Sequence, residues 1–188
     1  MRVVSLLPAA TEIVAALDML DHLVAVSHEC DYPEGVSAKP HATHCPIHGG
    51  GLASRDIDRW VTDTLAATGT LYTMDEALIR RLAPDVILTQ RLCDVCAVGY
   101  DSVTAFAATL PRPPRVVNLD PSSVEDILAD VQNVGDALGV AERAATVVAG
   151  LRARIARVRE RAEHAPRPRC VQSRRPRARR DATSAAPR

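Results

Sequence analysis

The amino-acid sequence predicts an α/β fold with a mostly parallel, Rossmann-like sheet, followed by one long helix. Short apolar runs alternate along the chain with longer segments whose apolar residues recur at helical spacing. The connections between these segments are short, which is typical of parallel strands joined by helices. The 188 residues are 47% hydrophobic, enough for one domain with a core, and no apolar run is long enough to span a membrane.

The first half of the chain begins with a strand at 3–7. Pro8–Thr11 then forms a loop that leads into a helix with Ile13, Ala16, Leu17 and Leu20 on one face. A second strand is expected at 23–27. Residues 28–51 contain three prolines, four histidines and three consecutive glycines, which together indicate a long loop.

The second half continues the alternation. Helices are expected at 54–65, from Thr73 or Asp75 to Leu82, and at 101–110, with strands at 86–89 and 115–119. Ser122 and Glu125 have the spacing of a capping box, which would begin a helix that Gly139 ends.

A longer helix is expected at 141–163. Its apolar residues alternate steps of four and three and form a narrow stripe: Ala144, Val148, Leu151, Ile155, Val158 and Ala162. The same spacing is compatible with a coiled coil, although three heptads are short for one.

Charge divides the chain into two unlike parts. Up to His164 there are 15 Lys and Arg against 22 Asp and Glu, a net charge of −7. From Ala165 onward there are eight Arg and one Asp, a net charge of +7, in a segment with almost no apolar residues. We therefore expect an α/β lobe at 1–140, a connecting helix at 141–164 and a disordered basic tail at 165–188.

The overall charge of zero and the five aromatic residues argue against a specific nucleic-acid-binding protein. The Arg-rich tail still leaves nonspecific, salt-dependent binding to nucleic acid as the last-ranked hypothesis.

The first ten residues do not form a secretion signal, because they contain one Arg and a short apolar run that Pro8 interrupts. As written, the sequence predicts a cytoplasmic protein. The cysteines are odd in number and do not suggest a disulfide scaffold: Cys30, Cys45, Cys93, Cys96 and Cys170.

Three segments follow predicted strands directly: Pro8–Thr11, His28–Pro33 and Gln90–Cys96. In open parallel sheets, ligands bind outside the carboxyl ends of the strands. We therefore expect polar groups from these segments to converge on one site.

Cys93 and Cys96 form a CxxC motif, and with His28 and Cys30 they could provide four zinc ligands. A redox pair or thiols that only pack in a pocket are alternatives. The loop at 41–48 holds three His and one Cys, which could also capture a soft metal, although surface histidines are the commoner explanation. The sequence contains no P-loop, HExxH or GxSxG motif, and we expect no enzyme activity.

Several segments resemble class III substrate-binding proteins of ABC importers, which carry iron–siderophores, haem or vitamin B12. The segments are SLLPAATE at 5–12, VSHECDYP at 26–33 and LAPDVIL at 82–88. The string LTQRLCDVCA at 88–97 is similar to a Cys-containing, cobalamin-binding-like subgroup that often lacks a signal peptide.

The resemblance implies two α/β lobes joined by a long helix, with ligand held in a shallow cleft between them. Cobalamin would then be the bound ligand and not a cofactor. Zinc is the metal expected if the Cys and His residues form a metal site. The implied ligand contacts are Pro8, Ala9, Ser27, His28, Tyr32, Gln90, Arg91 and Cys93. Asp101 stands roughly where the family carries an acid that docks onto an ABC permease.

The resemblance runs from about Arg2 to Glu163 and stops near Arg169, where the basic tail begins. We therefore expect a truncation or frameshift after the first lobe, so that the second lobe is missing. The apolar stripe of the helix at 141–163 would then lack a covering surface and favour self-association. A protein that delivers a solute to an importer from outside the cell also needs an export signal, and the first residues do not have the pattern of one.

Overall fold

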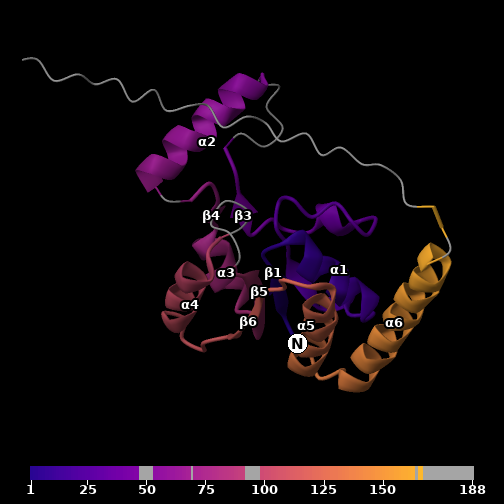
Figure 1. Ribbon diagram of the computed structural model, residues 1–188. Coiled ribbons are helices and arrows are strands. Elements are labelled where there is room, and N and C mark those ends of the chain that lie inside the picture. Colours follow the sequence, from indigo (N-terminus) through magenta and orange to yellow (C-terminus); the bar gives the residue numbers. More distant parts are fainter. Residues whose placement is uncertain (47–52, 69, 92–97, 164, 167–188) are drawn as a thin grey trace, which may run out of the picture.

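The computed structural model describes residues 1–46, 53–68, 70–91, 98–163 and 165–166. Its centre is a four-stranded parallel sheet with strand order β2-β1-β5-β6 (Figure 1). The strands are β1 (Val3–Ser5), β2 (Leu23–Ala25), β5 (Val86–Gln90) and β6 (Arg115–Leu119). The predicted α/β class with a parallel sheet is confirmed.

Helices cover both faces of this sheet, so its strands are buried on both sides. The neighbouring residues Val3 and Val4 of β1 belong to two different apolar clusters, one on each face. The first cluster contains residues of α1 (Pro8–Ala16), α5 (Val124–Ala137) and α6 (Ala141–Glu163). The second contains residues of α3 (Glu76–Leu82) and α4 (Tyr100–Ala108).

Except for one short 3₁₀ turn that precedes β2, the remaining elements lie between β2 and β5 in the sequence. They include a two-stranded antiparallel pair, β3 (Thr43–His44) with β4 (Thr73–Met74), and the helix α2 (Ser54–Thr68). Two short 3₁₀ turns, η1 (Leu20–His22) and η2 (Val36–Ala38), complete the order. The segment 28–46, expected as loop, therefore contains η2 and β3.

The prediction of a loop at Pro8–Thr11 is wrong, because these residues form the first turn of α1. Leu7 has an extended backbone and precedes a proline at the start of the helix, where the missing amide proton costs nothing. Leu20, expected on this helix, lies instead in η1, since α1 ends at Ala16.

The capping box before α5 is shifted by one residue. Ser123 is the N-cap, and its Oγ accepts a hydrogen bond from Asp126 N at 3.2 Å. The Asp126 carboxylate in turn accepts hydrogen bonds from Ser122 N at 3.0 Å and Ser122 Oγ at 2.9 Å. The Ser123 and Ser122 hydrogen bonds hold the pKa of Asp126 below its usual value.

Helix α6 has the predicted bounds, but its cover decreases along its length, and Leu151 and Ile155 are only partly buried against the first cluster. Gly139 follows α5 and has a left-handed backbone, with φ +73°. The chain reverses its direction there, so that Ala144 of α6 packs against Gly135 of α5. Ala144 and Val148 are buried, whereas Val158 is 62% exposed. None of the helices in the described part of the chain is long and apolar enough to cross a membrane.

Gly135→Ala should destabilise the fold, because the added Cβ would collide with the Cβ of buried Ala144. Overpacking of this kind costs about 1–3 kcal/mol, measurable by urea unfolding. Gly150→Ala in α6 is the matched control, since an added Cβ there meets nothing within 4 Å. The control should gain up to about 1 kcal/mol from helix propensity, and equal losses in both variants would contradict the α5–α6 packing.

Candidate ligand site at the carboxyl ends of the strands

The carboxyl ends of β1, β2 and β5 meet at one edge of the sheet. These strands are adjacent and parallel, so Ser5, Ala25 and Gln90 end at the same side. Beyond β2, residue Val26 pairs with His41 and brings the 41–46 segment beside this edge. The edge is therefore where the residues predicted to bind ligand can gather.

A buried hydrogen-bond chain holds the end of β1 to α1 and to the loop after β2. Thr11 Oγ1 donates to Ser5 Oγ at 2.8 Å, and Ser5 Oγ donates to the Leu7 carbonyl at 2.9 Å. The Cys30 Sγ lies 3.2 Å from Thr11 Oγ1. Since the single Thr11 proton goes to Ser5, the Cys30 thiol must be the donor, which completes a chain of one direction.

This chain requires a protonated Cys30. Burial raises the pKa of the Cys30 thiol above its ordinary value, which agrees with its role as a donor. A thiol in this state is a poor nucleophile and a poor metal ligand until it loses its proton. Cys30 therefore acts, in this structure, as a structural donor under the strand-end edge.

His28 is held firmly at the end of β2. Its side chain is 6% exposed. Its Nδ1 lies 2.8 Å from Thr43 Oγ1, and its Nε2 lies 3.3 Å from Glu29 Oε1. The ring centroid is 5.4 Å from that of Tyr72. His28 is thus fixed between β3, its neighbour Glu29 and an aromatic ring.

Thr43 also holds Ser27, whose Oγ is 3.0 Å from Thr43 Oγ1. Ser27 is 3% exposed and its hydroxyl accepts a further bond from Glu29 N at 3.3 Å. Its hydroxyl is therefore engaged in positioning the loop.

Arg91, just after β5, pairs with the acid predicted to dock a permease. Arg91 Nη2 lies 3.3 Å from Asp101 Oδ1, and the guanidinium stands 4.6 Å above the centre of the Tyr100 ring. The parallel bridge between Gln90 and Gly99 brings the two segments together. The Asp101 side chain is 92% exposed, so this ion pair is a surface pair of small energy.

The predicted ligand residues take different positions. Tyr32 is 62% exposed on the loop after β2, and Arg91 is exposed beyond β5. Pro8 and Ala9 lie in the first turn of α1, and Gln90 is the last residue of β5. Cys93 lies outside the described residues.

The predicted zinc site is described only in part. His28 and Cys30 are two residues apart and each has a hydrogen-bond partner, whereas Cys93 and Cys96 lie outside the described residues. Within the described ranges, no group of three His, Cys, Asp or Glu side chains could hold a metal ion. The zinc site stays a prediction.

Three residues that shape this edge were not expected as site residues: Thr11, Thr43 and Tyr72. Thr11 lies within the SLLPAATE segment, but a threonine in a sequence motif does not by itself indicate a buried hydrogen bond. Thr43 lies between His41 and His44, whose spacing indicates a possible metal loop rather than a hydroxyl that holds His28. Tyr72 carried no local signal, because only the pairing of β3 with β4 brings it near His28.

No family model matches the chain. Among curated proteins, one match is the bifunctional purine biosynthesis protein PurH of Streptococcus uberis, 30% identical over 124 residues. The match covers 60% of this chain and only 22% of PurH, too little to carry that protein's activity over.

Solved structures give a consistent likeness in fold. The apo periplasmic heme-binding protein RhuT of Roseiflexus sp. RS-1 superposes with a TM-score of 0.64 at 21% identity, covering 89% of this chain and 52% of RhuT. A periplasmic heme-binding protein of Pseudomonas aeruginosa gives 0.61 at 18% identity, covering 85% and 46%. The periplasmic vitamin B12-binding protein BtuF of Vibrio cholerae gives 0.61 at 18% identity, covering 87% and 51%.

The chain therefore has the fold of one part of the periplasmic heme- and vitamin B12-binding proteins, and it spans about half of their length. These structural neighbours are binding proteins rather than enzymes.

Thr11→Val should destabilise the protein by about 1–3 kcal/mol, because it leaves the buried hydroxyl of Ser5 and the Cys30 thiol without their partner. Urea unfolding measures the loss. Thr146→Val is the matched control, since the exposed Thr146 hydroxyl bonds only to the Glu142 carbonyl of its own helix. Losses of equal size would show that the chain of hydrogen bonds does not hold the edge together.

Proposed function

We propose that this chain is the ligand-binding first lobe of a solute-binding protein of an ABC importer, for a cobalamin-like or iron-chelate ligand. The observation that carries the proposal is the edge where β1, β2 and β5 end. A buried scaffold there positions His28, while Tyr32 on the loop after β2 and Arg91 just after β5 remain exposed.

The chemistry of these groups suits a large, flat ligand with polar substituents. Tyr32 offers an aromatic surface, and the Arg91 guanidinium can form charge-assisted hydrogen bonds to carboxylate or phosphate groups. The structural neighbours that bind heme and vitamin B12 support the same class of ligand. A chain of half their length would contribute one wall of the cleft, and a second lobe would contribute the other.

Asp101 is the proposed docking acid for a permease. Its carboxylate is almost fully exposed and its partner Arg91 holds it through a surface ion pair. A permease arginine could replace Arg91 at little energetic cost, because an exposed ion pair contributes only about 0–1 kcal/mol. Docking and ligand contact would then be linked through the shared Arg91.

Titration calorimetry with cobalamin, haemin and a ferric hydroxamate tests the ligand proposal. We expect one of them to bind, both to this chain and to the chain extended by a second lobe. His28→Ala should weaken that binding at least about tenfold, or about 1.4 kcal/mol, because it removes the buried ring that holds the strand-end loop against Thr43 and Tyr72. His22→Ala is the matched control, because His22 lies at the opposite end of β2, in η1, with its Nδ1 3.1 Å from the Met1 carbonyl. Failure of all three ligands on both chains would reject the proposal.

A second candidate is a metal-handling protein, because His28 and Cys30 follow β2 and a CxxC motif follows β5 in the sequence. Cys30 would then lose its proton and its hydrogen bond to Thr11 on becoming a ligand. The purified protein should then hold about one zinc per chain, as a single four-ligand site does. Mass spectrometry under native conditions measures it. Cys93→Ser should abolish the zinc and Cys45→Ser should retain it, because Cys45 is buried outside the proposed set. Zinc that survives Cys93→Ser would exclude this site.

A further inference from the structure

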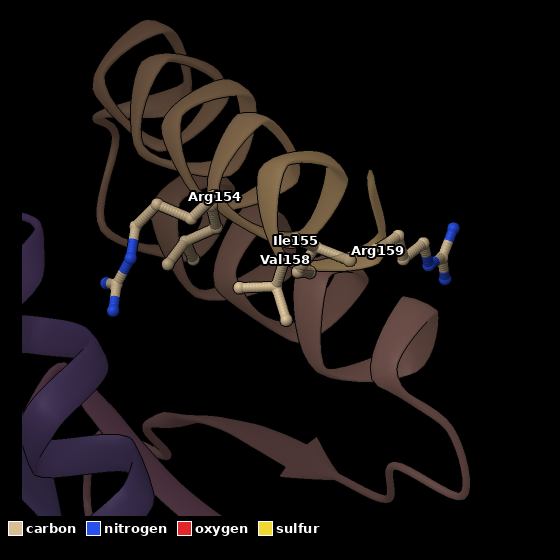
Figure 2. Close-up of a pocket in the computed structure, with 5 residues that line it drawn as sticks. Arg154, Ile155, Val158 and Arg159 are labelled. Carbon is tan, nitrogen blue, oxygen red and sulfur yellow. The ribbon is translucent and has the colours of Figure 1, made fainter. Parts of the chain in front are cut away.

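The second half of α6 carries an exposed apolar groove. A hollow of about 360 Å³ is lined by Leu151, Arg154, Ile155, Val158 and Arg159, and a second one continues it along Val158, Arg161, Ala162 and Ala165. Figure 2 shows Ile155 and Val158 in the middle, with the side chains of Arg154 and Arg159 extending to opposite sides.

The arginines of this half-helix border the groove on both sides. At about 100° per residue, Arg159 and Arg152 fall on one side of the apolar stripe, and Arg154 and Arg161 fall on the other. Arg152 already pairs with Glu125 of α5 at 3.0 Å, and Glu163 falls beside it, so Arg154, Arg159 and Arg161 are the arginines offered to a partner. Arg157 falls further round the helix, about 130° from the middle of the apolar stripe, and does not line the groove. Residues 151–163 hold five Arg against two Glu, whereas residues 1–150 hold ten Lys and Arg against twenty Asp and Glu. A positively bordered groove thus belongs to a negatively charged body.

Helix α2 has the reverse arrangement. Its apolar side chains recur at spacings of three and four and form one face: Ile57, Trp60, Val61 and Leu65. None of its residues whose exposure is described is buried, and in Figure 1 the helix stands away from the sheet and from α6.

The acidic residues of α2 border its apolar face. By the same helical geometry, Asp58 falls on one side of that face and Asp56 and Asp63 on the other. Arg55 and Arg59 fall on the back of the helix. The face is therefore apolar with negative borders, which is the complement of the α6 groove.

We propose that α2 of one copy docks into the α6 groove of a second copy, and that the two copies do so reciprocally. Helix packing would bury the apolar faces against each other while each row of Asp meets a row of Arg. A dimer through two α6 grooves is disfavoured, because it would bring arginines against arginines. In a two-fold dimer the same contact is made twice, so each weak charge pair counts twice.

This surface lies away from the strand-end edge, and the proposal does not depend on which ligand binds there. It predicts a dimer of the full chain, detected by sedimentation velocity across a concentration series. Arg154→Glu with Arg159→Glu should weaken dimerisation at least about tenfold, because four attractions per dimer become repulsions. Arg157→Glu reverses one arginine that does not line the groove and should leave the dimer intact.

The decisive test combines two variants, one with reversed charges on α2 and the other with reversed charges on α6. The chain with Asp56→Arg and Asp58→Arg should also be monomeric alone. Mixed with the Arg154→Glu, Arg159→Glu chain, it should form a heterodimer, because acid again meets base at both contacts. Recovery on mixing also shows that both variants are folded, and circular dichroism checks their helix content.

Three results would overturn the proposal. They are a wild-type chain that stays monomeric, an effect of the Arg154 and Arg159 changes no larger than that of Arg157→Glu, and monomeric variants that do not associate on mixing. The first would also be the result if α2 packs on α6 of its own chain or if another surface covers the groove.

Discussion

The arrangement of the protein depends on the burial of β1 between two parallel neighbours. Val3, Val4 and Ser5 are fully buried, with β2 on one side and β5 on the other. Because successive side chains of a strand point to opposite faces, this one strand requires apolar cover both from α1, α5 and α6 and from α3 and α4. It also places the ends of three strands together, which sets the edge where the candidate ligand site lies.

The polar groups at this edge serve two different purposes. The chain from Cys30 through Thr11 and Ser5 to the Leu7 carbonyl is entirely internal, and it satisfies groups that burial would otherwise penalise. Tyr32 and Arg91 stay exposed and can contact a ligand. This division explains how a site can be rigid beneath its surface while its contacting side chains remain free to adapt.

Charge and apolar surface are distributed unevenly over the same chain. The body is acidic, while the second half of α6 presents apolar residues between arginines. Such a surface is costly to leave in water and is electrostatically matched to acidic partners. The acidic borders of α2 offer that match within the protein's own sequence, so self-association and ligand binding use separate surfaces.

The sequence by itself determined the fold class, the strands of the four-stranded sheet to within two residues and the bounds of α6, because the spacing of apolar residues along one segment is a local property. It also pointed to the loops after β2 and β5. It did not predict β3 and β4, whose pairing joins residues far apart in the chain.

Tertiary structure decided what local patterns cannot encode. Two adjacent serines offer equal caps, and backbone geometry selected Ser123. Arg91 met Asp101 only because Gln90 pairs with Gly99, and Tyr72 met His28 only through the pairing of β3 with β4. The part of α6 that stays exposed likewise depends on where α5 begins, because α6 runs back along α5 from the turn at Gly139 and extends beyond the first residues of α5.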